Sequence, residues 1–183
     1  MLDQITPVIL TSNEEMNIGR CLERLRWAHI VVVMDSGSTD KTEAICDQYK
    51  NVRFFTQPFE NHALQWSAAV ENPLVKTEWV LIFDADYIMD DEFERELNSL
   101  KPSMGTSAYE SEFIYWINGH PLSQCVYPSR IVLARKNNLS FYLDGHTQRQ
   151  KVAGQIEKLH RKLQHDDRKS ESHGQLSQAK YAQ

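Results

Sequence analysis

Two aspartates one residue apart, Asp84 and Asp86, are the residues of this sequence whose type and spacing most directly suggest chemistry. They follow an unbroken apolar run at residues 79–83, which is typical of a strand buried on both faces. Open α/β sheets bind ligands beyond the carboxyl ends of such strands. Two close carboxylates repel each other, and a divalent cation such as Mg²⁺ or Mn²⁺, bridging to phosphate oxygens, would relieve that repulsion. A polar turn that merely ends the strand is the alternative interpretation.

Four apolar strands that alternate with helical patterns are expected to position the aspartates. The strands are predicted at residues 5–10, 30–34, 52–56 and 79–83, and the helices at about 18–25, 39–49, 61–70 and 90–100. This alternation predicts an α/β fold with right-handed crossovers, helices on both faces, and a parallel sheet of strand order 3-2-1-4. Beyond residue 105 the pattern favours a smaller portion of mixed or antiparallel strands, at about 109–117, 131–134 and 139–143.

Three polar side chains follow separate predicted strands of this sheet. Asn13 follows the first strand, Asp35 the second and Asp84 the fourth. The carboxyl ends of parallel strands meet at one edge, and the topological switch falls between the first and fourth strands. The three side chains should therefore line one crevice, which favours a ligand site over a simple turn at Asp84 and Asp86.

Length, charge and cysteine content restrict the class of protein. The 183 residues suit one domain: residues 1–169 with a binding half (1–104) and a second half (105–169), followed by a polar tail (170–183) that is helical or disordered. A net charge of -5 argues against a general nucleic-acid binder. The three widely spaced cysteines favour reduced thiols in a cytoplasmic protein. No signal-peptide pattern and no apolar run of bilayer-spanning length is visible in the sequence.

The polar segments after the strands resemble those of a known family when they are taken together. They are Thr-Ser-Asn-Glu at 11–14, Asp-Ser-Gly-Ser-Thr-Asp at 35–40 and Phe-Asp-Ala-Asp at 83–86. In this order, on a βαβ pattern, they resemble the inverting family 2 glycosyltransferases, which have the GT-A (Rossmann-like) nucleotide-sugar-binding fold. The segments 119–122, 144–148 and 165–170 look like those of a bacterial subgroup that builds lipopolysaccharide cores or other surface glycans.

The resemblance implies a donor site for a nucleotide-sugar, with a UDP-sugar as the expected donor. The residues expected to contact the donor are Thr11, Asn13, Glu14, Asp35, Asp84 and Arg168. A divalent cation, Mg²⁺ or Mn²⁺, is implied as cofactor, with Asp86 as its ligand and His165 as a further one. Helix capping remains the alternative role for Asn13 and Glu14, and a surface position the alternative for His165 and Arg168.

The resemblance also implies a catalytic base, because an inverting transfer needs a group that accepts the proton of the attacking hydroxyl. Asp144 and His146 are the two candidates, and the choice between them stays open. Related branches carry His-Glu near this place, so Thr147 after His146 is a departure. The expected acceptor is a glycan or glycolipid such as lipopolysaccharide core, with possible peripheral contact at the inner face of the membrane.

Two other functions are compatible with parts of the pattern. The first is a module that binds nucleotide-sugars without turnover, because the second half is short and altered. The second is a metal-dependent nucleotidyltransferase or phosphohydrolase. A nucleotidyltransferase should have a glycine-rich phosphate loop after the first strand, and residues 11–14 contain no glycine.

Overall fold

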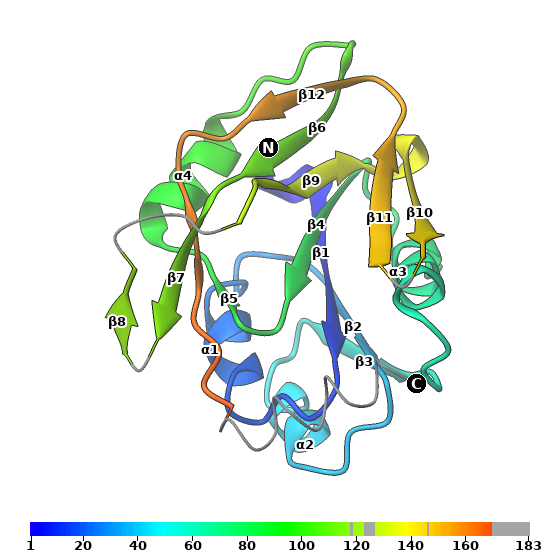
Figure 1. Cartoon of the computed structure of the whole chain (residues 1–183), viewed down its shortest axis with the longest axis vertical. Coiled ribbons are helices and arrows are strands. Elements are labelled where there is room, and N and C mark those ends of the chain that lie inside the picture. The colour runs from blue at the N-terminus through cyan, green and yellow to red at the C-terminus, as the bar shows by residue number, and fades with distance from the viewer. Residues whose placement is uncertain (118, 123–126, 146, 170–183) are drawn as a thin grey trace.

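A seven-stranded mixed sheet forms the centre of the protein, as seen in a computed structural model that describes residues 1–117, 119–122, 127–145 and 147–169 (Figure 1). The sheet has the strand order β12-β6-β9-β4-β1-β2-β3. Its strands are β1 (Ile5–Thr11), β2 (Val31–Asp35), β3 (Val52–Thr56), β4 (Trp79–Asp84), β6 (Thr106–Ser111), β9 (Arg130–Arg135) and β12 (Gln155–Lys158). The α/β fold class is therefore confirmed.

The first four predicted strands form a parallel unit in the predicted order 3-2-1-4. Strand β1 lies between β2 and β4 and is parallel to both, and β2 is parallel to β3. The register places Thr11 beside Asp35 and Leu10 beside Asp84. The carboxyl ends of β1, β2 and β4 consequently lie side by side.

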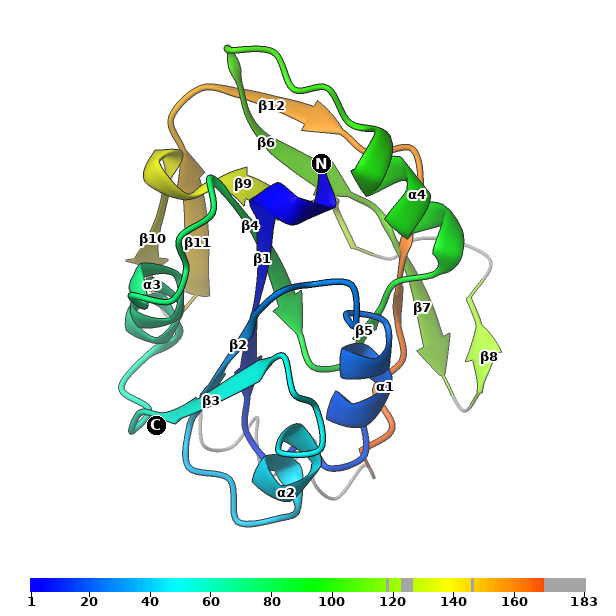
Figure 2. The ribbon, with the colours of Figure 1, turned by 180° about the vertical axis from the view of Figure 1, so that it is seen from behind.

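Helices cover both faces of this sheet, as predicted (Figure 2). Helices α1 (Ile18–Glu23), α2 (Thr42–Cys46) and α4 (Asp91–Ser99) pack on one face, against Val31, Val33 and Leu81 among others. Helix α3 (His62–Glu71) packs on the other face, against Val32, Met34 and Val80. Successive strand residues thus enter opposite apolar layers, because side chains alternate along a strand.

Helix α2 is shorter than the predicted helix at residues 39–49. The segment before it is a loop in which the Asp40 carboxylate accepts hydrogen bonds from the backbone N–H and hydroxyl of Thr42, at 2.9 and 2.5 Å. Such side-chain bonds to local backbone compete with helical ones, so the helix begins only at Thr42.

The second half adds β6, β9 and β12 to the central sheet, with β9 antiparallel to both β4 and β6. The predicted strand at 109–117 is two strands: β6 stays in the central sheet, whereas β7 (Phe113–Ile117) joins a smaller sheet of order β5-β13-β7-β8. The other strands of that sheet are β5 (Tyr87–Ile88), β8 (His120–Pro121) and β13 (Leu163–His165).

A separate antiparallel hairpin, β10 (Leu139–Asp144) and β11 (Thr147–Val152), lies beside α3. Strands β11, β12 and β13 were not predicted, because they are short and largely polar and so lack an apolar alternation. Residues 170–183, the predicted polar tail, lie outside the described residues. Within the described part of the chain, no helix is long and apolar enough to cross a bilayer.

Candidate functional site

Polar residues from the ends of β1, β2 and β4 meet at one edge of the sheet, the place where the sequence predicts a crevice. Thr11 Oγ1 donates a hydrogen bond of 2.7 Å to Asp35 Oδ1, joining the ends of β1 and β2. Asp84 ends β4 on the other side of β1. The topological switch between β1 and β4 therefore carries an acidic group on each side.

The Asp35 carboxylate is buried and organises the loop after β2. Its side chain accepts hydrogen bonds from the backbone N–H groups of Gly37 (2.8 Å) and Ser38 (2.6 Å), and from the Ser38 hydroxyl (2.5 Å). Gly37 has a φ of 91°, a left-handed conformation that glycine adopts at low cost. Asp35 therefore fixes the conformation of the loop after β2, and direct contact of this carboxylate with a nucleoside remains a prediction.

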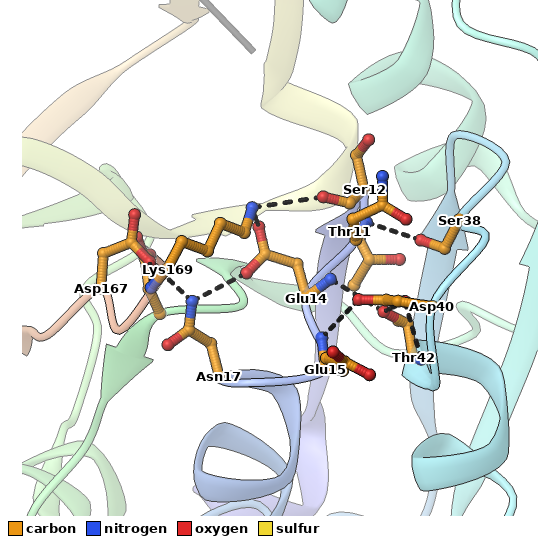
Figure 3. Close-up of polar contacts among 12 residues, drawn as sticks. Thr11, Ser12, Glu14, Glu15, Asn17, Ser38, Asp40, Thr42, Asp167 and Lys169 are labelled. Atoms are coloured by element: carbon orange, nitrogen blue, oxygen red, sulfur yellow. Dashed lines mark hydrogen bonds and ion pairs between the residues drawn. The ribbon is translucent and has the colours of Figure 1, made fainter. Parts of the chain in front are cut away.

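Asn13 and Glu14 join the loop after β1 to the loop after β2 (Figure 3). The backbone N–H of Asn13 donates to Ser38 Oγ at 2.7 Å, and that of Glu14 donates to Thr42 Oγ1 at 2.8 Å. The Asn13 side chain accepts from the Thr39 N–H at 2.8 Å, and its φ of 52° is one that asparagine tolerates. These bonds hold the two loops together at the edge where β1 and β2 end.

The Glu14 carboxylate contacts the last described residues of the chain (Figure 3). Lys169 Nζ forms an ion pair with Glu14 Oε1 and donates to the Ser12 carbonyl at 3.2 Å. Asn17 Nδ2 donates to the other Glu14 oxygen at 2.9 Å. Burial raises the pKa of Glu14 to about 7, although the charge and hydrogen bond of Lys169 act to lower it.

Asp86 and His165, the two predicted metal ligands, lie in direct contact. His165 Nε2 is 2.8 Å from Asp86 Oδ2. Among the described residues, Asp86 Oδ1 and His165 Nδ1 are buried and have no hydrogen-bond partner. Burial acts to lower the pKa of His165, but the hydrogen bond and charge of Asp86 outweigh it and the pKa is raised. Asp86 therefore stabilises the protonated form of His165.

The charges of Asp86 and His165 also act on the Asp84 carboxylate. Burial, and then the negative charge of Asp86, raise the pKa of Asp84, whereas the Arg130 charge acts to lower it. A cation close to both carboxylates would remove the repulsion between them. The two carboxylates are of the kind that binds Mg²⁺ or Mn²⁺.

Two of the described residues, Asp86 and His165, are placed to bind a metal ion. Within the described ranges, no group of three His, Cys, Asp or Glu side chains is arranged to hold a metal ion. The unpartnered Oδ1 of Asp86 is an available oxygen ligand beside His165. Mg²⁺ commonly binds proteins through one or two carboxylates and takes its other ligands from substrate phosphates and water. Asp86 and His165 therefore fit a cation that a diphosphate completes.

A cleft of about 570 Å³ opens between the end of β4 and the β10–β11 hairpin. Its walls include Asp84, Tyr87, Arg130, Gln148 and Arg149. The many hydrogen-bonding groups of this cleft suit a polyhydroxylated ligand. Arg130 was not predicted as a site residue, since an arginine at the start of a strand carries no distinguishing sequence signal.

Asp144 lies at the edge of this cleft, on the exposed hairpin. Its side chain is 64% exposed and pairs with Arg149, which lines the cleft, at 3.5 Å. The other candidate base, His146, lies outside the described residues. Asp144 therefore lies near the cleft, because it pairs with Arg149 of the cleft wall, but its own side chain is largely exposed.

The Arg168 side chain contacts Asp166. Its guanidinium pairs with Asp166 Oδ2 at 3.0 Å, and its side chain is 56% exposed. Lys169, the next residue, is the cation that reaches that loop. Sequence reasoning also missed Asn17, which is fully buried and bonds to Asp167 Oδ1 at 2.8 Å, because a lone asparagine at a helix start indicates only a cap.

Comparison with known proteins gives one family match. The model of the family described as "Glycosyl transferase family 2" matches residues 7–101, which is just over half of the chain. The matched segment contains most of β1, all of β2 to β4, the two cross-linked loops, Asp84 and Asp86.

Curated relatives match part of the sequence, including two glycosyltransferases. A lipopolysaccharide core biosynthesis glycosyltransferase, LpsC, of Rhizobium meliloti (strain 1021) is 31% identical over 116 residues, covering 61% of this chain and 40% of that protein. An uncharacterized glycosyltransferase of Rickettsia felis is 29% identical over 109 residues, covering 59% of this chain and 38% of that protein. The chain spans about two fifths of the length of these relatives.

Solved structures resemble the fold at low sequence identity. S. aureus TarS 1–349 in complex with UDP-GlcNAc has a TM-score of 0.68 at 16% identity and covers 91% of this chain and 59% of that one. The glucosyl-3-phosphoglycerate synthase of Mycobacterium tuberculosis, in complex with Mn²⁺, UDP and phosphoglyceric acid, has a TM-score of 0.55 at 16% identity. The match covers 74% of this chain and 57% of that one. These likenesses show a GT-A fold.

Proposed function

This chain belongs to glycosyl transferase family 2, and we propose that it transfers a sugar from a nucleotide-sugar donor to a glycan or glycolipid acceptor. The donor is a UDP-hexose and the acceptor is a saccharide of the lipopolysaccharide-core type. The UDP-GlcNAc in complex with TarS and the UDP in complex with the M. tuberculosis synthase support the choice of donor, and the name of LpsC supports that of acceptor.

The observation that carries the proposal is the contact between Asp86 and His165 at the edge where β1, β2 and β4 end. The cross-linked loops with Asn13 and Glu14 follow β1 and β2 at this edge. The cleft that contains Asp84 lies at the end of β4. A nucleoside on the loops and a sugar in the cleft would leave the diphosphate between them, beside Asp86 and His165.

Each proposed donor residue has a distinct task. Thr11 and Asp35 hold the loop after β2, while Asn13 and Glu14 face the nucleoside. Asp84 accepts from a hydroxyl of the ribose or sugar. Arg168, freed from Asp166, or the adjacent Lys169 supplies positive charge to the diphosphate.

Asp86 and His165 would hold Mg²⁺ or Mn²⁺, which supplies charge neutralisation to the departing nucleoside diphosphate. In the transfer, an acceptor hydroxyl oxygen forms a bond to the anomeric carbon as the bond from that carbon to the phosphate oxygen breaks. The hydroxyl proton passes to the base, which is Asp144 or His146. The nucleoside diphosphate leaves with the electron pair, and the anomeric configuration inverts.

Calorimetric titration of the protein with UDP, with and without Mn²⁺, tests the donor site. The proposal expects UDP binding that Mn²⁺ strengthens, and it fails if UDP does not bind in either condition. A screen of UDP-sugars for hydrolysis then identifies the hexose.

A binding module without turnover is the second candidate, and the position of Asp144 favours it. This carboxylate is largely exposed and paired with Arg149, so it is not pre-positioned as a base. Metal-dependent UDP binding without hydrolysis or transfer of any UDP-sugar would support that candidate.

A further inference from the structure

A second pocket lies against β7 and His165. It has a volume of about 350 Å³ and is lined by Tyr115, Trp116, Ile117, Leu122, Tyr127, His165 and Asp167. Five of these side chains are aromatic or aliphatic, and the two polar ones come from β13 and the segment after it. Apart from His165, the residues that line this aromatic pocket have no role in the donor site described above.

The aromatic wall continues directly into the proposed metal pair. The Tyr115 ring lies 4.8 Å from the His165 ring and 5.1 Å from the Tyr127 ring, measured between centroids. His165 in turn contacts Asp86 at 2.8 Å. A ligand in the pocket would therefore lie against the same imidazole that faces the donor's diphosphate.

The chemistry of the walls selects the kind of ligand. A pyranose ring has flat C–H faces that pack on aromatic rings, and hydroxyls at its edge that bond to polar side chains. Asp167 supplies such a polar group beside the rings, whereas His165 contributes ring atoms, since its Nε2 contacts Asp86 and its Nδ1 is buried. An acyl chain would cover the Asp167 carboxylate without bonding to it, which costs free energy. Binding sites of this size commonly combine apolar walls with a few polar groups in this way.

We propose that this aromatic pocket, formed around Tyr115 and Tyr127, binds a sugar ring of the acceptor saccharide. The proposal rests on the proposed function, because it assigns the acceptor side of the same reaction. Binding there places the acceptor next to the Asp86–His165 pair. Tyr127, at 56% exposed, is a residue that determines acceptor affinity without touching the donor.

The test measures acceptor and donor binding separately on the same variants. The acceptor probe is the lipid-free core oligosaccharide released from bacterial lipopolysaccharide by mild acid, titrated in the presence of UDP and Mn²⁺. The donor probe is UDP with Mn²⁺. Tyr127→Ala should weaken oligosaccharide binding about tenfold, corresponding to the loss of one stacking partner, and leave UDP binding unchanged. Tyr127→Phe keeps the ring and should bind the oligosaccharide like the original protein.

Tyr142→Ala is the matched control, because Tyr142 is an exposed tyrosine (48%) on the β10–β11 hairpin outside the pocket. The inference is overturned if Tyr127→Ala and Tyr142→Ala bind the oligosaccharide equally well, or if UDP binds and the oligosaccharide does not. If dodecylphosphocholine binds in a Tyr127-dependent way and the oligosaccharide does not, the pocket is assigned to a lipid and the inference is also overturned. If UDP does not bind but the oligosaccharide binds and this binding depends on Tyr127, the donor proposal is overturned and the inference about the acceptor is not.

Discussion

His165 Nε2 lies 2.8 Å from Asp86 Oδ2, across 79 residues of sequence. The contact forms because β13 pairs with β5, the two-residue strand directly after Asp86, and places His165 opposite Tyr87. The rings of Tyr87 and Tyr115 then pack around the imidazole, with centroids 5.4 and 4.8 Å from it. The aromatic shell holds this side chain beside the carboxylate.

Asp86→Asn should abolish the strengthening of UDP binding by Mn²⁺. The amide keeps the size of the side chain but removes the charge that attracts the cation. We expect Mn²⁺ to change the UDP dissociation constant less than twofold in this variant, compared with tenfold or more in the original protein, as measured by calorimetry. Asp3→Asn, at a site 74% exposed near the N-terminus, is the control and should retain the full Mn²⁺ effect. An unchanged Mn²⁺ effect in Asp86→Asn would place the cation elsewhere.

Glu14 should make the folded state less stable as pH rises from about 4.5 to about 7. Burial raises the pKa of the folded Glu14 carboxyl to about 7, from the 4.5 expected when it is unfolded. Between these values the folded state binds the proton more strongly, so its stabilising contribution is complete below pH 4.5 and is lost by pH 7. The loss is on the order of 1–3 kcal/mol.

The measurement is the free energy of unfolding in urea at pH 5 and pH 7.5 for the original protein and for Glu14→Gln. The glutamine variant has no group that titrates at this position, so its stability should fall less over this range. Equal pH dependence in the two proteins would show that Glu14 does not titrate with a raised pKa.

Lys169→Met should lower stability more than Arg168→Met. Lys169 Nζ lies in a largely buried ion pair with Glu14, and its removal leaves that carboxylate without its main cation, at a cost of about 1–3 kcal/mol. Arg168 is 56% exposed, and exposed ion pairs contribute about 1 kcal/mol or less. Thermal unfolding should show a decrease in Tm of several degrees for Lys169→Met. A larger decrease for Arg168→Met would contradict this order.

Asp144→Asn separates binding from turnover. Because the Asp144 side chain is 64% exposed and lies at the cleft edge, its loss should leave the stability and the UDP affinity within twofold of the original values. If Asp144 is the base, the rate of sugar transfer should fall at least 100-fold, as measured by UDP release with a bound acceptor. Normal turnover in Asp144→Asn, combined with loss of turnover in His146→Ala, would assign the base to His146.

The amino-acid sequence by itself determined the parallel unit and the edge that carries the site. Apolar runs at β1, β2 and β4 are buried on both faces, and the helices between the strands impose crossovers of one hand. Asn13, Asp35 and Asp84 reach one edge because parallel strands end there together. These local patterns were sufficient to predict the fold class, the strand order and the family resemblance.

Only the tertiary structure decided which distant residues complete that edge. Strands β11 to β13 are short and polar, so no periodic signal shows that β13 returns to β5 and brings His165 to Asp86. The same return places Lys169, rather than Arg168, on Glu14, and leaves Asp144 on an exposed hairpin. Pairing of short polar strands is determined by the surfaces that surround them, and a single sequence does not contain that information.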